Sequence, residues 1–509
     1  MPAVKFPTAA RADIGLLLEG TFPFVAGGVS SWVNQIIRAF PEYRFACVFI
    51  GGQPEDYGEM KYALPDNVVH LETHYLHTPH HLPKIKPHDG DGETFARVEE
   101  LHDYLRSPAR DRFDSTLFEQ VFAELFKGGK LSEQAFLYSR ASWDYTTKQY
   151  RRFSTDPSFV DYFWTVRMMH QPLWLFARIA ENLIPVRAFH TVSTGYAGFL
   201  GALLKRRSGR PLILSEHGIY TKERKIDLFQ SEWIKDSRNL FHRNPAEISY
   251  IRRLWIRFFE SLGRVCYDSA DIITALYEAN RQRQIADGAD PARTRNIPNG
   301  VNLQRLAPLR EKRPATTPPV LCLIGRVVPI KDVKTFIRAM RIVANRLPEA
   351  EGWIAGPTDE DPEYGRECMN LVASLGLADR VKFLGFQKID DILPKIGVML
   401  LSSISEALPL VILEGYAAGV PTVATDVGSC RQLVYGFGED DAALGASGRV
   451  VRIADPQALA DASLELLTDH AAWRAAQQAG IRRVEKFYTQ ELMFERFRDV
   501  YREALGEKE

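Results

Sequence analysis

Two glutamates spaced eight positions apart, Glu406 and Glu414, lie in the segment of this sequence whose residue types most clearly suggest chemistry. The apolar run 398–401 is typical of a buried parallel strand, and Pro409 suits the first turn of a helix that follows it. Glu406 is then expected in the strand-to-helix loop, and Glu414 little more than one turn into the helix. Both would lie near the carboxyl end of a sheet, where open α/β sheets bind ligands.

The chemistry of this segment suits a nucleotide sugar. A carboxylate such as Glu414 can accept hydrogen bonds from two hydroxyls, as a ribose diol requires. Free backbone N–H groups at a helix start, together with the helix dipole, favour polar oxygens and negative charge. We expect this backbone surface to be formed by Ala407, Leu408, Pro409 and Leu410. Two glutamates near a loop are also typical of a solvated helix start, so the prediction depends on the residues that accompany them.

Arg326 and Lys331 flank a loop that follows another strand-like run, 320–324. Two cations at such a place could neutralise the charge that develops on a diphosphate leaving group, with the arginine donating to two oxygens at once. The alternative is a pair of solvated surface cations, which is common for isolated arginines and lysines.

Two features of the first half are candidates for the same chemistry. Gly27 and Gly28 open a helical pattern that runs to Ala39, and paired glycines let a backbone approach a phosphate closely. They form neither the dinucleotide-binding fingerprint nor a P-loop. His217 ends a strand-like run, and a neutral imidazole there could hydrogen-bond a sugar hydroxyl near the reacting carbon. A glycine turn and a structural histidine are the alternatives.

Composition narrows the class of protein. Lys plus Arg equals Asp plus Glu at 64 each, which argues against nucleic acid as the main partner. The 5 cysteines are scattered and show no C-x-x-C spacing, so we expect a reducing cytoplasm and no disulfide framework. No apolar run approaches the ~18 residues of a spanning helix, so any contact with an inner membrane is expected to be peripheral.

Short apolar runs alternate with helical patterns in both halves of the chain, which is typical of α/β domains with parallel sheets. Strands are predicted at 13–18, 45–50, 188–193, 211–215 and 271–275, and then at 320–324, 352–355, 380–386, 397–401 and 421–424. A segment of about 53–155 breaks the alternation and is interpreted as a large insertion. We expect an N-terminal Rossmann-like domain at 1–295, a C-terminal one at 296–488, and a helix at 489–509 that crosses back to the N-terminal domain.

Together these residues resemble the family 4 glycosyltransferases, which are retaining enzymes of the GT-B fold with two Rossmann-like, doubly wound domains facing across a cleft. The span from Glu406 to Glu414 is similar to the family's E-x7-E motif. Gly325, Arg326 and Lys331 resemble its phosphate loop, and the glycine pair resembles its first-domain glycine loop. The segments 215–218 and 18–23, with the long insertion, are similar to the PelF branch, which serves Pel exopolysaccharide synthesis.

The resemblance implies a hexosyltransferase that takes a nucleotide diphosphate sugar, expected to be UDP-linked, and extends an exopolysaccharide at the cytoplasmic side. Partners would be the sugar donor, a polysaccharide acceptor bound on the N-terminal side, and an inner-membrane polysaccharide synthase complex. No metal or other cofactor is implied, because two cations neutralise the leaving group. The implied roles are sugar binding by Glu406 and the adjacent N–H groups, ribose binding by Glu414, diphosphate binding by Arg326 and Lys331, and a nucleotide base near Phe386 and Gln387.

The chain departs from the family pattern near the sugar side of the site. Ser429 and Gln432 stand where many members carry a glycine and a glutamate, and Gly415-Tyr416 stands where small helix formers are usual. Donor choice therefore cannot simply be inherited from the family. Two other functions stay open: a non-catalytic GT-B scaffold that binds nucleotide sugar within a synthase complex, and a hydrolase or epimerase of the nucleotide sugar.

Two further patterns have both a functional and an ordinary interpretation. His70, His74 and His77 have helical spacing and could share a metal, although a histidine-rich surface loop is the simpler interpretation. Two basic stretches could dock on anionic lipid: 205–207 with Arg210 at the end of a helical pattern, and 252–253 at the start of one that contains Trp255, Phe258 and Phe259. Aromatics at helical spacing more often belong to a core, and charge runs more often form a solvated face.

Overall fold

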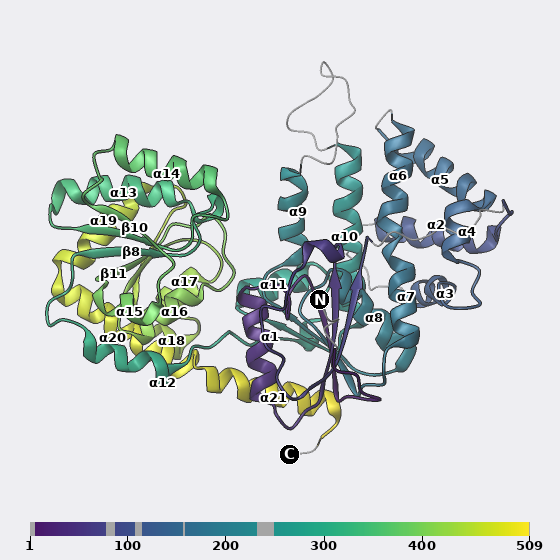
Figure 1. The fold of residues 1–509 in the computed structure, drawn as a ribbon, viewed down its shortest axis with the longest axis horizontal. Coiled ribbons are helices and arrows are strands. Elements are labelled where there is room, and N and C mark those ends of the chain that lie inside the picture. The colour runs from purple at the N-terminus through teal and green to yellow at the C-terminus, as the bar shows by residue number, and fades with distance from the viewer. Residues whose placement is uncertain (1–5, 78–86, 107–114, 156–157, 232–248, 508–509) are drawn as a thin grey trace. The chain divides into compact units, whose positions relative to one another are not determined.

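The chain divides into two compact units in the computed structural model (Figure 1), which describes residues 6–77, 87–106, 115–155, 158–231 and 249–507. The first unit comprises Met1–Ala275, Arg281–Arg295 and Arg498–Glu509. The second comprises Leu276–Asn280 and Asn296–Phe497.

The described part of the first unit is built on a 7-stranded sheet of order β3-β2-β1-β4-β5-β6-β7. Its strands are β1 (Ile14–Glu19), β2 (Phe45–Gly51), β3 (Val68–Tyr75), β4 (Ala188–Thr191), β5 (Leu212–Glu216), β6 (Ile272–Ala275) and β7 (Thr294–Asn296). The pairings from β3 through β6 are parallel; Leu16, for example, lies opposite both Cys47 and His190. Strands β1, β2, β4 and β5 are almost entirely buried, as expected for a parallel sheet covered on both faces.

The helices that connect these strands are α1 (Gly28–Ala39), α8 (Tyr196–Ser208), α9 (Tyr220–Gln230), α10 (Tyr250–Ser269) and α11 (Glu278–Ala286). Glycines let α8 lie close to the sheet, since a Cβ at Gly201 would stand 2.7 Å from Leu212 Cδ1. Helix α8 ends at Gly209, whose φ of 69° is the left-handed conformation that terminates many helices.

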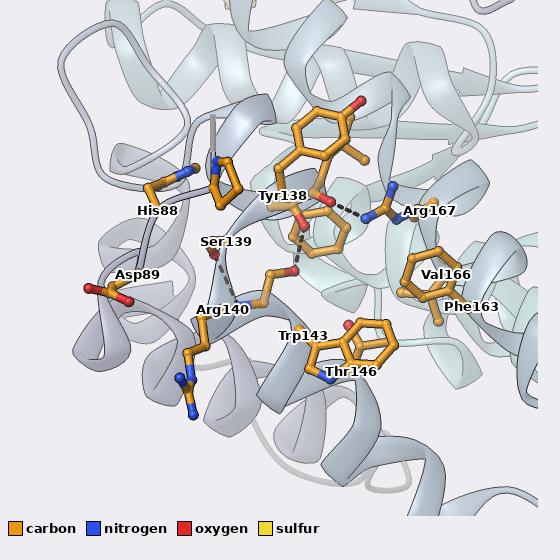
Figure 2. A pocket seen from close by; sticks show the side chains of 14 residues that line it. His88, Asp89, Tyr138, Ser139, Arg140, Trp143, Thr146, Phe163, Val166 and Arg167 are labelled. Atoms are coloured by element: carbon orange, nitrogen blue, oxygen red, sulfur yellow. Dashed lines mark hydrogen bonds between the residues drawn. The ribbon is translucent and has the colours of Figure 1, made fainter. Parts of the chain in front are cut away.

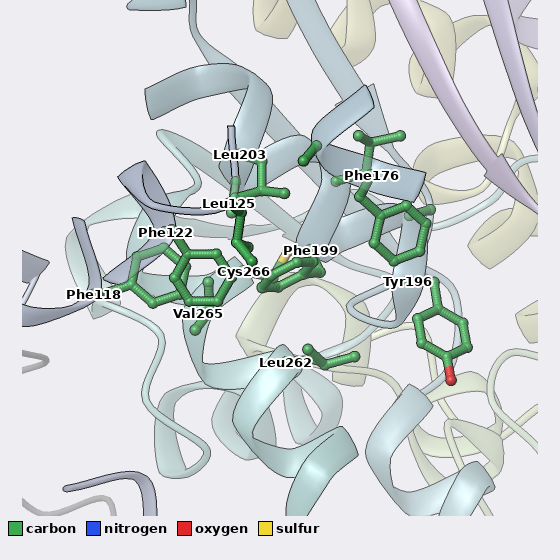
Figure 3. Close-up of a cluster of buried hydrophobic side chains, with 14 of the residues drawn as sticks. Phe118, Phe122, Leu125, Phe176, Tyr196, Phe199, Leu203, Leu262, Val265 and Cys266 are labelled. Carbon is green, nitrogen blue, oxygen red and sulfur yellow. The ribbon is translucent and has the colours of Figure 1, made fainter. Parts of the chain in front are cut away.

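A group of helices is inserted between β3 and β4: α2 (Gly92–Arg106), α3 (Ser115–Ala123), α4 (Glu133–Tyr138), α5 (Arg140–Phe153), α6 (Phe159–His170) and α7 (Pro172–Asn182). Figure 3 shows how it is fixed to the sheet domain: Phe122 and Phe176 pack against Phe199 of α8, with ring centroids 5.2 and 6.1 Å apart. The sequence placed the insertion at about 53–155. Residues 68–75 are instead a sheet strand, and the inserted helices continue to Asn182.

The last helix, α21 (Gln490–Leu505), contributes its final turns to the first unit. Tyr501 is buried against the rings of Phe40, Tyr43 and Phe45, and its hydroxyl lies 2.9 Å from Nδ1 of His190. This aromatic group joins the end of the chain to β2, β4 and the end of α1.

The second unit contains a parallel 6-stranded sheet of order β10-β9-β8-β11-β12-β13 in its described residues. Its strands are β8 (Val320–Ile324), β9 (Glu351–Ala355), β10 (Val381–Gly385), β11 (Val398–Leu401), β12 (Thr422–Thr425) and β13 (Gly448–Val451). The α-helices are α12 (Leu303–Leu306), α13 (Val333–Arg346), α14 (Pro362–Ser374), α15 (Ile389–Ile392), α16 (Leu410–Ala417), α17 (Cys430–Tyr435), α18 (Glu439–Ala442), α19 (Pro456–Thr468) and α20 (His470–Phe487).

Two apolar cores lie on the two faces of this second sheet. Helices α13, α14 and α19 cover one face, and α16 and α17 cover the other (Figure 1). The core on the α16 and α17 face surrounds the buried side chain of Arg483. Its guanidinium donates to Asp441 Oδ1 at 2.6 Å and to the backbone oxygens of Val434 and Gly445, each at 2.9 Å.

All ten strands predicted from the sequence are present, with ends that agree within one or two residues. Strands β3, β7 and β13 were not predicted. The 5 cysteines are buried and unpaired. None of the described helices combines the length and apolar character needed to cross a bilayer.

Candidate functional site

Lys331 and Glu406 meet at the carboxyl end of the second sheet. Lys331 ends the loop after β8, Glu406 lies in the loop after β11, and Lys331 Nζ is 2.6 Å from Glu406 Oε1. Ser403 Oγ donates to the same carboxylate oxygen at 2.7 Å. The backbone of Lys331 is also held in place, because Ser402 Oγ donates to its carbonyl oxygen at 2.9 Å. The sequence identified both residues of the pair but did not predict that they contact each other.

The backbone beside Glu406 is fixed by a tight turn after β12. Gly428 has a φ of 53°, and a Cβ there would stand 2.4 Å from the carbonyl oxygens of both Glu406 and Ala407. Ser429 N donates to the Ala407 oxygen at 2.9 Å. Helix α16 begins at Leu410; Ile412 N donates to the Pro409 oxygen at 3.1 Å, whereas the N–H groups of Leu410 and Val411 have no acceptor within the helix. Pro409 precedes the helix as its cap rather than lying in the first turn, and its ring nitrogen has no N–H to offer.

Arg326 lies in the same β8 loop but points to another partner. Its guanidinium donates to Glu360 Oε1 on the surface, and both side chains are about half exposed. A diphosphate at this loop would have to replace Glu360. Phe386 is 81% exposed just beyond β10, and Gln387 Nε2 donates to the Leu384 oxygen at 2.7 Å. The structure therefore does not bring Arg326, Phe386 or Gln387 into contact with the Lys331–Glu406 pair.

Glu414 occupies the second turn of α16 and is mostly enclosed. Its side chain is 19% exposed, and its closest cation is Arg305, with Nη2 3.9 Å from Glu414 Oε1. Burial raises the pKa of Glu414 to about 7; Asp390 adds to this effect and Arg305 opposes it. A buried carboxyl with one distant cation has unused hydrogen-bonding capacity, which is what a ribose diol would use.

The chain departs from the family pattern at Gly415-Tyr416 and at Ser429 and Gln432, and these residues have different surroundings in the structure. Tyr416 is 1% exposed and packs on Gly480, where a Cβ would stand 2.8 Å from Tyr416 Cδ1. It is a core residue and does not border the site. Ser429 does border it: the side chain is buried next to Ala407, and its hydroxyl has no hydrogen-bond partner among the described residues. Gln432 Nε2 donates to Tyr488 OH at 3.2 Å.

In the first unit, Gly28 begins α1 and Gly27 is its cap, as the sequence predicts for the helix start. Nothing lies within 4 Å of the place where a Cβ would stand at either glycine, so the backbone is accessible there. His217 follows β5 and its ring stands edge-on to Trp32 of α1, with centroids 4.6 Å apart. Its Nε2 is buried without a hydrogen-bond partner in the described part of the chain. Burial lowers the pKa of His217 to about 4, so the imidazole is neutral at physiological pH.

His217 lines a cavity of about 710 Å³ at the carboxyl ends of β1 and β5. A polar group in the same lining was missed by the sequence analysis: Tyr220 OH donates to Glu19 Oε1 at 2.8 Å, and Arg224 Nε donates to Tyr220 OH at 3.1 Å. Ala197 N, at the start of α8, donates to the other oxygen of Glu19 at 3.2 Å. The position of Glu19 at the carboxyl end of a buried strand was the signal that could have identified it.

The histidine-rich segment does not form the helix that a shared metal site required. His70 and His74 lie on strand β3, and both bond to Glu72, with Nε2–oxygen distances of 2.8 and 3.0 Å. His77 follows the strand, whereas His80 and His81 lie outside the described residues. Within the part of the chain that the structure describes, no group of three histidine, cysteine or acidic side chains has a metal-binding arrangement.

Both basic stretches are also explained by local contacts. Lys205 Nζ lies 2.6 Å from Asp271 Oδ1, and Arg206 Nη2 lies 3.0 Å from Asp268 Oδ2. Trp255 and Phe259 of α10 are buried in the core. These contacts favour core packing for the aromatic residues and a solvated surface for the basic residues over docking on anionic lipid.

Residues 12–292, more than half of the sequence, match the family model described as Domain of unknown function (DUF3492). The chain belongs to this family. Residues 318–469 match the model Glycosyl transferases group 1, so the DUF3492 region is followed by a group 1 glycosyltransferase domain similar to those of family 4.

Curated relatives match part of the DUF3492 protein. D-inositol 3-phosphate glycosyltransferase of Salinispora tropica is 31% identical over 240 residues, covering 43% of this chain and 48% of the relative. Exopolysaccharide phosphotransferase SCO2592 of Streptomyces coelicolor is 34% identical over 165 residues, covering 32% of this chain and 16% of the relative. The chain thus spans about half, or less, of the length of these two relatives.

Solved structures match the DUF3492 protein over almost its whole length. Anabaena Alr3699/HepE in complex with UDP and glucose has a TM-score of 0.56 at 15% identity, covering 96% of this chain and 99% of that one. Sucrose-phosphate synthase from Thermosynechococcus elongatus has a TM-score of 0.55 at 18% identity, covering 97% and 100%. With the two parallel sheets, these likenesses show the GT-B fold.

Proposed function

We propose that this protein is a retaining glycosyltransferase that moves a hexose from a UDP-linked sugar to a growing polysaccharide. The observation that carries the proposal is the Lys331–Glu406 contact of 2.6 Å at the carboxyl end of the second sheet, within the group 1 glycosyltransferase domain. Glu414 lies eight positions further on, mostly enclosed and with unused hydrogen-bonding capacity.

Each residue has a role that its surroundings permit. Lys331 can turn from Glu406 to the diphosphate, and Arg326 can exchange the exposed Glu360 for phosphate oxygens. Glu406, released from the lysine, accepts hydrogen bonds from the donor sugar hydroxyls, and the first N–H groups of α16 lie beside it. Glu414 binds the ribose diol. Phe386 and Gln387, beyond β10, are proposed to lie near the base.

Catalysis on this proposal comes from positioning and from the two cations that stabilise the leaving diphosphate. The acceptor hydroxyl attacks the anomeric carbon on the face from which the diphosphate leaves, and a phosphate oxygen takes its proton. The anomeric configuration is then retained without a covalent intermediate. This route needs no metal ion, because Arg326 and Lys331 supply the positive charge.

The acceptor is proposed to bind at the first unit. Its 710 Å³ cavity is lined by the hydroxyl-binding groups of Glu19 and Tyr220 and by the neutral imidazole of His217. Gly27 and Gly28 are proposed to bind phosphate through their accessible backbone. Exopolysaccharide as the product, membership of the PelF branch, and a cytoplasmic location beside an inner-membrane synthase complex are proposed from the resemblance of segments 18–23 and 215–218.

The proposal is tested by incubating the purified chain with UDP-hexoses and oligosaccharide acceptors and determining the product's anomeric configuration by NMR. A glycan product with the donor's configuration is expected, and Glu406→Ala should abolish turnover while keeping most of the nucleotide affinity. Full activity in Glu406→Ala would show that the site is assigned wrongly. Nucleotide-sugar binding without turnover would favour a scaffold, and sugar release or epimerisation without acceptor would favour a hydrolase or an epimerase.

A further inference from the structure

The inserted helices carry a pocket of about 600 Å³ that the donor and acceptor sites do not use (Figure 2). It lies between α4, α5 and α6 and the short segment that contains His88 and Asp89. This segment is fixed to the start of α5, since Arg140 N donates to the His88 oxygen at 3.1 Å and Ala141 N donates to the Asp89 oxygen at 2.9 Å. The pocket walls are therefore held by backbone hydrogen bonds.

Arg167 of α6 is the distinctive residue of this pocket. Its guanidinium carbon lies 4.2 Å from the ring centroid of Phe163 and 5.5 Å from that of Tyr138, and one nitrogen donates to the Leu137 oxygen. None of the carboxylates that the structure describes forms an ion pair with it. Burial lowers the pKa of Arg167, which is the sign of a cation that has lost water without gaining an anion.

An aromatic face stands beside this cation. Trp143 of α5 is 51% exposed, although its ring packs edge-on against Phe163 with centroids 5.9 Å apart. An exposed tryptophan that is held in place offers a flat apolar surface at little cost in side-chain freedom. Figure 2 shows Asp89 on the opposite side of the pocket from Arg167, with Trp143 below Arg167 in this view. The pocket thus presents a cation, a flat apolar face and a hydroxyl acceptor at separate places.

We propose that this pocket binds an acidic carbohydrate, with its carboxylate or phosphate on Arg167 and a sugar ring on Trp143. A pyranose has an apolar C–H face that matches an indole, and hydroxyls that Asp89 can accept hydrogen bonds from. The anionic group forms charge-assisted bonds with a guanidinium that has no carboxylate partner in the described structure. A neutral sugar would leave that cation unpaired, so the pocket discriminates by charge. The inference is independent of the donor site and of the reaction proposed for it.

The test uses the full-length protein and calorimetric or saturation-transfer NMR titration with four probes. These are an oligogalacturonate of four units, glucose 6-phosphate, neutral maltotetraose and inorganic phosphate. We expect saturable binding of the oligogalacturonate or the sugar phosphate at least ~10-fold tighter than binding of maltotetraose. The tighter of the two anionic probes identifies the group as a carboxylate or a phosphate.

Variants separate this pocket from general charge effects. Arg167→Gln keeps a donor for the Leu137 oxygen and should weaken the anionic sugar ~10-fold or more. Trp143→Ala, at an exposed position with little risk to folding, should weaken the sugar probes but not inorganic phosphate. Arg151→Gln, an exposed arginine elsewhere on α5, is the matched control and should change nothing. Equal binding of maltotetraose, or an equal loss in Arg151→Gln, would overturn the proposal.

Discussion

Lys331 Nζ and Glu406 Oε1 lie 2.6 Å apart, although their residues come from two different strand-to-helix loops of the second sheet. The proposed function assigns one to the diphosphate and the other to the sugar. Their contact compensates both charges, and Ser403 remains as a partner for Glu406 when the lysine moves. Donor binding would replace the Lys331–Glu406 bond with charge-assisted bonds to the donor, so neither side chain would be left as an unpaired charge.

Replacing the lysine should affect the chemical step. Lys331→Ala removes a cation placed for the leaving diphosphate, and the loss of one such group typically lowers kcat by ~10²–10³-fold. UDP should also bind more weakly. Lys334→Ala is the matched control, because this lysine is on α13, pairs with Glu367 and has no role in the proposed site. Steady-state kinetics with a UDP-hexose would measure both, and an unchanged kcat in Lys331→Ala would contradict the role given to this residue.

Glu414 should make the stability of the protein depend on pH. Its folded pKa of about 7 lies above the 4.5 of an unperturbed glutamate, so the folded state favours the protonated form. The stabilisation is complete below pH 4.5 and is lost as the pH rises through 7, by up to about 3 kcal/mol. Glu414→Gln cannot ionise, so it should unfold at higher urea concentration than the parent at pH 8 and at a similar concentration at pH 4.

The same substitution should weaken UDP binding at pH 8, because an amide oxygen is a poorer acceptor for a diol than a carboxylate. Glu439→Gln, at an exposed position on α18, serves as the control and should change neither property. If Glu414→Gln were less stable than the parent at pH 8, the buried carboxylate would have to be stabilised by more than its ion pair with Arg305.

Gly428 should be required by its contacts as well as by its backbone conformation. An alanine there would place its Cβ 2.4 Å from the carbonyl oxygens of Glu406 and Ala407, so the sugar-binding loop must shift. Gly438 has a φ of 79° and open space around its Cβ position, so Gly438→Ala reports the conformational cost alone. Gly428→Ala should be destabilised by about 1–3 kcal/mol more than Gly438→Ala in urea unfolding. Equal losses would mean that the contact is unimportant.

The buried Arg483–Asp441 pair should dominate the local stability of the second unit. Arg483 is 0% exposed, and its removal leaves a buried carboxylate and several carbonyl oxygens without donors. Arg483→Met should therefore cost about 3–5 kcal/mol. Arg482→Met, on the exposed side of α20, should cost much less. Thermal and urea unfolding of both variants would check this, and similar values for the two would refute the importance of the pair.

The sequence predicted the sheets well because parallel strands are short, apolar and separated by helices. Strand β3 was missed because His70, Glu72, Thr73 and His74 give the segment a polar, histidine-rich composition. The structure shows that Glu72 pairs with both histidines. The edge strand β7 has only three residues, and β13 carries arginine at its second position.

The donor residues were predictable from spacing, whereas their partners were not. The Lys331–Glu406 contact and the pairing of Arg326 with Glu360 join residues 75 and 34 positions apart, and a single sequence has no signal for either. Tyr416 shows the same limit: its departure from the family pattern indicated a change in the site, but the side chain fills the space above Gly480 in the core.

Calorimetric titration of the purified protein with UDP, ADP and GDP, repeated with Glu414→Ala, tests the donor site most directly. The proposal predicts selective binding of UDP, with affinity reduced ~10-fold or more in the variant. Absence of binding by all three nucleotides, or UDP binding that is unchanged in Glu414→Ala, would contradict the assignment of Glu406, Lys331 and Glu414 to a nucleotide-sugar site.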